Sequence, residues 1–167
     1  MINFMDTPGL KCVPAEYRPA VAGIEQSETQ GFPWIATDTH TLKVYRFKNE
    51  KDAYNGIAKL IREGHHLAVG IAQIKVSEFN AMHVTLSSAI SPCSAARSVS
   101  NAIQMNLNWA GGHGYLHLYG FEAAASGYTS GSLIPPSKMV VGYVKNTVYV
   151  AQQVAYDMHI DPAYLIR

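Results

Sequence analysis

Three short polar segments hold the residues that could do chemistry, and each lies between apolar stretches where the chain is expected to change direction. They are Glu28-Thr29-Gln30-Gly31-Phe32-Pro33-Trp34, Gly70-Ile71-Ala72-Gln73-Ile74 and Gly127-Tyr128-Thr129-Ser130-Gly131-Ser132, the last followed by Gly142-Tyr143-Val144. The acid among them, Glu28, indicates what the chemistry would be.

Glu28 is predicted at the end of a helix over residues 17–28, in line with the apolar side chains of Val21 and Ile24. A carboxyl group there is partly desolvated and faces the negative end of the helix dipole, and both effects raise its pKa. A glutamic acid that stays protonated near neutral pH can protonate the leaving oxygen of a glycosidic bond. A single helix-end glutamate is more often simply solvated, so this prediction depends on the other segments.

The order of the segments resembles the lytic transglycosylases of the lysozyme superfamily, in particular the small ones of type IV secretion and conjugation systems. Their first motif is Glu-Ser, with an apolar residue four positions before and a proline five positions after; Glu28-Thr29, Ile24 and Pro33 keep this spacing. Glu25 has no proline at that distance. The second motif, Gly-Leu-Met-Gln-Ile, is similar to residues 70–74.

The third motif, Tyr-Asn-Thr-Gly, is similar to residues 128–131, with Thr129 where the family usually has asparagine. A threonine accepts a hydrogen bond but lacks the two N–H donors of an amide. Weaker matches are Gly64-His65, Val69-Gly70, Gly142-Tyr143-Val144, Cys12-Val13-Pro14 and Ser91-Pro92-Cys93. The resemblance covers about residues 10–150, and it depends on the ordered set because each motif alone is weak.

The resemblance implies cleavage of the β-1,4 bond between N-acetylmuramic acid and N-acetylglucosamine in peptidoglycan, without water. Glu28 would protonate the glycosidic oxygen and then take the proton of the muramyl 6-hydroxyl, which gives a 1,6-anhydro product. The substrate's acetamido group can support the positive charge, so a second carboxylate is unnecessary. No cofactor and no metal are expected. The implied substrate-binding residues are Thr29, Ile71, Ala72, Gln73, Tyr128 and Thr129.

Two other functions stay open. If Asp38 faced Glu28 across the cleft, a hydrolytic muramidase would be the better interpretation, although aspartate between threonines is typical of turns. Alternatively, an inactive scaffold would only bind glycan or a secretion partner, and the departures at Thr29 and Thr129 are compatible with that. Tyr128 could hydrogen-bond Glu28 or the substrate. Phe32 and Trp34 offer apolar faces to a sugar, but core packing is favoured for both.

The histidines and glycines do not form a recognisable metal or nucleotide site. His113 and His117 are four residues apart, as in helical zinc sites, but Gly114 interrupts them and no third ligand follows at a suitable distance. The stretch 111–114 lacks the lysine and the serine or threonine of a phosphate-binding loop.

The spacing of Cys12 and Cys93 leaves two free thiols and one disulfide equally open. The family resemblance favours the disulfide, and with it a periplasmic or cell-envelope location. Residues 1–6 lack the pattern of a secretory signal, so either a leader is trimmed or export follows another route.

The composition is that of one soluble domain over residues 1–167, with a core of about 10–150. A net charge of +1 gives no basic field that would attract nucleic acid, and no apolar run is long enough to span a membrane. The expected partners are peptidoglycan glycan strands and, beyond them, type IV secretion or conjugation components.

The predicted fold is mostly α (α+β) and lysozyme-like, with helices around a glycan cleft and a small β element. Asn49 is predicted to cap a helix that Gly64 closes, with a stripe of Ala53, Ile57, Leu60 and Ile61. Residues 35–47 are predicted to form an irregular loop or small hairpin. The other expected helices cover 76–82, 93–108, 116–125 and 139–157; in the last, a helical valine period outweighs strand propensity.

Overall fold

The computed structural model describes residues 3–161, and its fold is mostly helical with one small antiparallel sheet, as predicted. The helices are α1 (Arg18–Thr29), α2 (Glu50–Arg62), α3 (Phe79–Met82), α4 (Leu86–Ile90), α5 (Pro92–Gly112), α6 (His117–Ser130) and α7 (Lys138–Asp157). The 3-10 turns are η1 (Phe4–Asp6), η2 (Leu10–Cys12), η3 (Ala15–Tyr17) and η4 (Val76–Glu78). The strands are β1 (Ile35–Asp38), β2 (Val44–Arg46), β3 (Leu67–Val69) and β4 (Ile74–Lys75).

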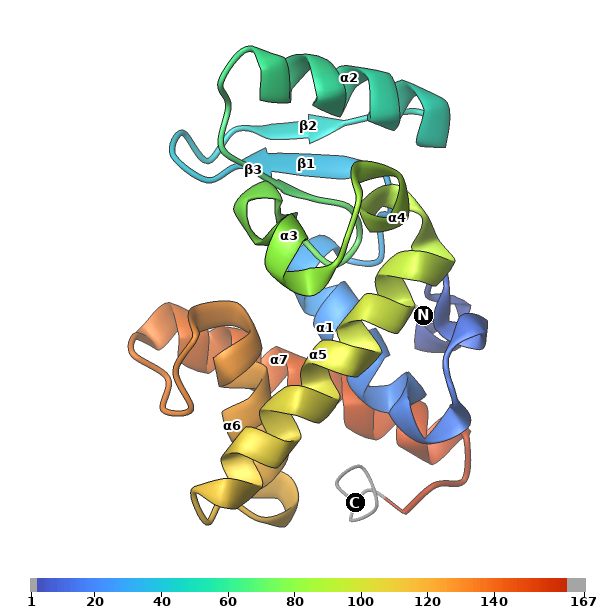
Figure 1. The fold of residues 1–167 in the computed structure, drawn as a ribbon. Helices are drawn as coiled ribbons and strands as arrows, with labels where there is room; N and C mark the ends of the chain where they lie inside the picture. The colour runs from blue at the N-terminus through green and yellow to red at the C-terminus, as the bar shows by residue number, and fades with distance from the viewer. Residues whose placement is uncertain (1–2, 162–167) are drawn as a thin grey trace.

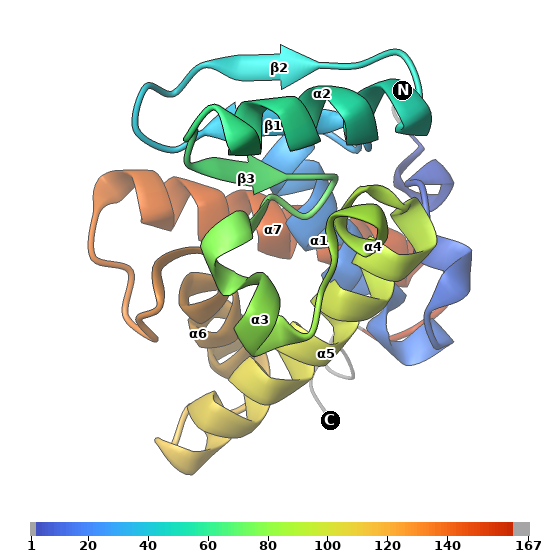
Figure 2. The same ribbon diagram turned by 45° about the horizontal axis from the view of Figure 1, so that its top comes forward.

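The sheet and α2 lie at one end of the molecule, and α5 and α6 extend toward the other, with α1 and α7 side by side between them (Figures 1 and 2). The strand order is β2-β1-β3-β4, and all pairs are antiparallel. Of the irregular loop and the small hairpin predicted as alternatives for residues 35–47, the structure shows the hairpin, formed by β1 and β2. No helix within residues 3–161 combines the length and hydrophobicity that a bilayer crossing requires.

Helices α1 and α7 pack together along much of their length, and this contact forms the centre of the core. Val144, Val148 and Ala151 are buried on one face of α7, which confirms the helical period predicted for residues 139–157. A Cβ atom at Gly23 of α1 would collide with the backbone carbonyl of Thr147 in α7. The two helices therefore meet backbone to backbone at this point.

Helix α2 follows its sequence signals closely. The side chain of Asn49 accepts a hydrogen bond of 2.9 Å from the backbone N–H of Asp52, which satisfies one free donor of the first turn. Ala53 and Ile57 are fully buried, whereas the opposite face is exposed. Gly64 follows with a φ of +86°, a conformation that glycine adopts without strain.

Several elements differ from the prediction. Helix α5 runs through Gly111 and Gly112 instead of ending near residue 108, because a glycine costs a helix only about 1 kcal/mol and Ala110 is buried against Ala123 and Leu133. Helix α6 continues to Ser130, so residues 127–130 of the third polar segment form its last turn. Strands β3 and β4 and helix α4 were not predicted, since elements this short carry no measurable periodicity.

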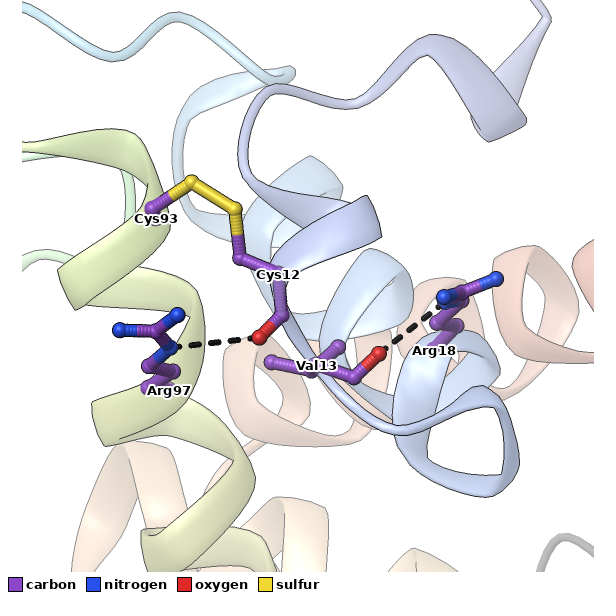
Figure 3. The surroundings of a disulfide bond; sticks show 5 residues. All are labelled: Cys12, Val13, Arg18, Cys93 and Arg97. Carbon is purple, nitrogen blue, oxygen red and sulfur yellow. Dashed lines mark hydrogen bonds between the residues drawn. A yellow bond between two sulfur atoms is a disulfide. The ribbon is translucent and has the colours of Figure 1, made fainter.

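A disulfide joins Cys12 in η2 to Cys93 in the first turn of α5 (Figure 3), with their Cα atoms 5.3 Å apart. This confirms the pairing that the family resemblance implied. Arg97 of α5 donates to the carbonyl of Cys12 at 3.3 Å, and Arg18 of α1 donates to that of Val13 at 3.1 Å (Figure 3). The segment before α1 is thus attached to both central helices.

Candidate active site

A cleft of roughly 640 Å³ brings together parts of the three polar segments found in the sequence. It lies among the end of α1, the sheet, the α3 region, α5 and α6. Four predicted site residues line it: Glu28, Gln73, Tyr128 and Thr129. The remaining lining residues are Thr37, Thr39, Leu42, Ala68, Ile74, Lys75, Glu78, Met82, Ala102, Asn106, Gly127, Ser130, Gly131 and Met139.

Glu28 lies in the last turn of α1, and burial raises the pKa of its carboxyl group to about 7. The hydroxyl of Tyr143 and the ammonium of Lys75 act in the opposite direction and limit this rise. The neighbouring Ser27 accepts hydrogen bonds of 2.9 Å from Asn146 and Thr147 of α7, which fix this turn against that helix. Near neutral pH, Glu28 therefore exists in both protonated and ionised forms.

Tyr143 of α7 is the neighbour of Glu28 that was not predicted as a site residue. Its hydroxyl is buried and lowers the pKa of Glu28, although its geometry falls outside that of a well-formed hydrogen bond. Burial, and next the charge of Glu28, raise the pKa of Tyr143 well above its usual value, so it stays a neutral phenol. Its signal in the sequence was the motif at residues 142–144.

Gln73 is held at the cleft wall by a tight turn between β3 and β4. Its backbone N–H and its side-chain amide both donate to the carbonyl of Gly70, at 3.1 and 3.0 Å. Only glycine fits at position 70, because its φ is +75° and a Cβ atom would collide with the carbonyl of Ala89. The amide of Gln73 is therefore positioned by the backbone.

Tyr128 lines the cleft, but its hydroxyl donates to the carbonyl of Ala72 at 3.0 Å. The donor of this hydroxyl is thus used within the protein, and its oxygen keeps the capacity to accept a hydrogen bond. Burial first, and then the charge of Glu28, raise the pKa of Tyr128 well above its usual value. Tyr128 ties the last turn of α6 to the turn that carries Gln73.

Three predicted substrate-binding residues, Thr29, Ile71 and Ala72, do not line the cleft. Their side chains are between 1% and 5% exposed. The hydroxyl of Thr29 lies 3.1 Å from the carbonyl oxygens of both Glu25 and Ile71, so it connects α1 to the turn at residues 70–73. These three side chains are part of the core behind the cleft wall. They support the residues that line the cleft and do not face it.

Asp38 does not line the cleft and does not supply a second acid opposite Glu28. Its carboxylate accepts hydrogen bonds from the backbone N–H groups of His40 and Thr41, both at 2.9 Å, and from Nδ1 of His65 at 2.7 Å. The His65 bond, followed by the backbone bonds, holds the pKa of Asp38 well below its usual range. It is the turn residue that the sequence favoured.

The other carboxyl group that lines the cleft belongs to Glu78 of η4. It is exposed and forms an ion pair of 3.3 Å with Lys75. Nothing in the sequence distinguished this residue, since the resemblance assigns no acid to its position.

Glu25 lies one turn before Glu28 but is fully buried and does not line the cleft. Neither of its carboxyl oxygens has a hydrogen-bond partner among residues 3–161. Burial raises its pKa to about 9, so it is protonated at neutral pH. The motif spacing therefore selects the glutamate that a ligand can reach.

The aromatic and histidine residues weighed in the sequence lie away from the cleft. Trp34 packs against the core, and Phe32 faces the guanidinium of Arg46, 5.1 Å from its ring centroid. His113 contacts the carbonyl of Trp109 through Nδ1 at 2.9 Å. Within the described part of the chain, no group of three or more histidine, cysteine, aspartate or glutamate residues could hold a metal ion.

The chain is similar to protein VirB1 of Agrobacterium fabrum. The two are 25% identical over 144 residues, which cover 86% of this chain and 57% of VirB1. The chain thus spans little more than half the length of that curated relative. No family model and no solved structure matches it.

Proposed function

We propose that this protein is a peptidoglycan lytic transglycosylase that cleaves the β-1,4 bond between N-acetylmuramic acid and N-acetylglucosamine. The observation that carries the proposal is the carboxyl group of Glu28, which lines a cleft of roughly 640 Å³ and has a pKa of about 7. A group with this pKa can give a proton in one step and take one in the next.

In the first step, protonated Glu28 gives its proton to the glycosidic oxygen, and the bond from that oxygen to C1 of muramic acid breaks. The acetamido oxygen of the same sugar supports the positive charge at C1. In the second step, ionised Glu28 removes the proton of the 6-hydroxyl while O6 bonds to C1. The product is a 1,6-anhydro sugar, no water is consumed, and Glu28 regains its proton.

The neighbours of Glu28 suit both steps. Tyr143 and Lys75 favour the ionised form and so assist the first proton transfer, while burial restores the acid afterwards. The amide of Gln73 and the hydroxyl of Thr129 offer hydrogen bonds to the sugar hydroxyl and acetamido groups.

For the biological setting, we propose local opening of the cell wall for a type IV secretion or conjugation apparatus. The ordered motifs and the similarity to VirB1 support this setting. The Cys12–Cys93 disulfide fits the oxidising periplasm or cell envelope. Glycan strands are the proposed substrate, and components of the apparatus are the proposed partners.

A hydrolytic muramidase is the second candidate, and the presence of Glu78 in the cleft is the observation that favours it. In that reaction a second carboxylate activates water or attacks C1. The ion pair with Lys75 and the exposure of Glu78 favour a solvated surface role instead.

The mass of the product separates these candidates. Digestion of purified peptidoglycan should yield muropeptides lighter by one water than those that a hydrolytic muramidase releases. Glu28→Gln should release them about 10²–10⁴-fold more slowly, whereas the exposed control Glu16→Gln should match the wild type. Products of hydrolysed mass would establish the muramidase, and unchanged cleavage by Glu28→Gln would overturn the proposed mechanism.

A further inference from the structure

A second pocket of roughly 400 Å³ adjoins the cleft at the open end of the sheet. It is formed by the turn after β1, the segment between α2 and β3, and the start of η4. Its polar lining consists of three imidazoles, one ammonium and two hydroxyls, from His40, His65, His66, Lys75, Thr39 and Ser77.

Hydrogen bonds hold these histidines in place. Thr39 donates from its backbone N–H to the carbonyl of His66 at 2.7 Å, and its hydroxyl donates to the same oxygen at 3.1 Å. The rings of His40 and His66 stack with centroids 4.1 Å apart. Asp38 accepts from Nδ1 of His65 at 2.7 Å. The two segments that carry the imidazoles are thereby fixed to each other.

The chemistry of this pocket matches an anion. No carboxylate lines it. The nearby carboxylate of Asp38 accepts hydrogen bonds from the backbone of the turn and from His65. Every polar side chain in its wall can donate a hydrogen bond in at least one protonation state. Lys75 is paired with Glu78, but both are exposed, and such pairs are weak enough to be replaced by a better-placed anion.

The pocket is continuous with the cleft, because Thr39 and Lys75 line both. A glycan bound in the cleft would therefore bring the substituents of its muramic acid toward the imidazoles. Muramic acid in peptidoglycan carries a peptide stem with free carboxylates. From this continuity and the histidine lining, we infer that the second pocket binds a carboxylate of the peptide stem, an inference that rests on the proposed function.

The test compares glycan strands that carry stems with the same strands after an amidase has removed them. The wild type should cleave the stem-bearing strands with a KM roughly 10-fold lower, as expected for hydrogen bonds to a charged group. His40→Ala combined with His66→Ala should abolish this difference and leave kcat on bare strands unchanged. His113→Ala, a histidine outside both pockets, is the matched control.

A binding measurement keeps the inference independent of cleavage. Glu28→Gln protein should bind a soluble stem peptide with free carboxylates and not the fully amidated peptide, and the double histidine variant should lose that binding. Equal binding of both peptides, or none, would overturn the inference even if glycan cleavage is intact. No cleavage of either strand type by the wild type would instead refute the proposed function. Thermal unfolding of the double alanine variant checks that any loss is not a loss of fold, and the milder pair His40→Gln with His66→Gln repeats the binding test if that variant is unstable.

Discussion

Two regions of the molecule shift the pKa of a little-exposed carboxyl group in opposite directions. At the end of α1, Glu25 and Glu28 have pKa values raised to about 9 and about 7 by burial. At the end of β1, the Asp38 residue is 2% exposed, yet its pKa is held well below the usual range. The difference lies in the donors: Asp38 accepts three hydrogen bonds, whereas the oxygens of Glu25 accept none within residues 3–161.

The comparison teaches that hydrogen-bond donors, more than exposure, decide whether a carboxyl group keeps its proton. Glu28 lies between the two extremes, since Tyr143 and Lys75 offset part of the effect of burial. Because its pKa lies between these extremes, Glu28 can both give and take a proton near neutral pH. Asp38 has none to offer at neutral pH, and its role is to hold the turn.

The largest expected effect is the difference in activity between substitutions of the two glutamates of α1. Glu28→Gln should lower the rate of peptidoglycan cleavage by about 10²–10⁴-fold, the usual contribution of general acid–base catalysis. Glu25→Gln should stay within a few-fold of the wild type, because Glu25 does not line the cleft. Turbidity loss of purified cell walls measures both. Equal losses would show that the two carboxyl groups act together.

The stability of the protein should depend on the two raised pKa values. A carboxyl group whose pKa is higher in the folded state stabilises the fold fully below its unfolded value of 4.5, and this contribution is lost as pH rises through the folded pKa. The wild type should therefore melt at progressively lower temperature between pH 4.5 and 9. Glu25→Gln should flatten the part between pH 7 and 9, and Glu16→Gln should not. An unchanged slope in Glu25→Gln would show that Glu25 ionises in the folded protein without cost.

Asp38 should show the reverse dependence on pH. Its lowered pKa stabilises the fold above the unfolded value of 3.8, and this contribution is lost as pH falls through the lower folded value. Asp38→Asn should melt several degrees below the wild type at neutral pH and show a weaker acid dependence. Thermal unfolding followed by circular dichroism provides the measurement, and an Asp38→Asn protein as stable as the wild type would contradict the anchoring role.

Tyr143→Phe should give the smallest effect. The hydroxyl of Tyr143 lowers the pKa of Glu28, so its removal should raise that pKa. Because the first step requires protonated Glu28, kcat/KM should fall above the pKa of about 7 in the wild type and at a higher pH in the variant. If the fall in kcat/KM occurs at the same pH in the variant, or at a lower pH, Tyr143 does not have this role.

The sequence predicted the parts of the site that follow from motif order. Glu28, Gln73, Tyr128 and Thr129 all line the cleft, because each belongs to a segment where a helix or strand ends. The direction of the Tyr128 hydroxyl could not be predicted, since it depends on the distance between α6 and the carbonyl of Ala72. Motif order also does not show which side chains face inward.

Fold prediction succeeded where periodicity was long. Helices α2 and α7 each bury one regular face, and their predicted bounds agree with the structure to within a residue or so. The strands β3 and β4 have three and two residues, too few for any alternation to be recognised. Helix α5 continues through Gly111 and Gly112 because tertiary contacts at Ala110 outweigh the low helix propensity of glycine.

The glycine at position 23 has a consequence for the chemistry several residues away. At this crossing the main chain of α1 touches the main chain of α7, so no side chain of residue 23 separates the helix of Glu28 from that of Tyr143 there. The spacing between acid and phenol is thereby built into the backbone. A single methyl group at this crossing would alter the acidity of Glu28 by moving its helix, without touching the substrate or any residue that meets it.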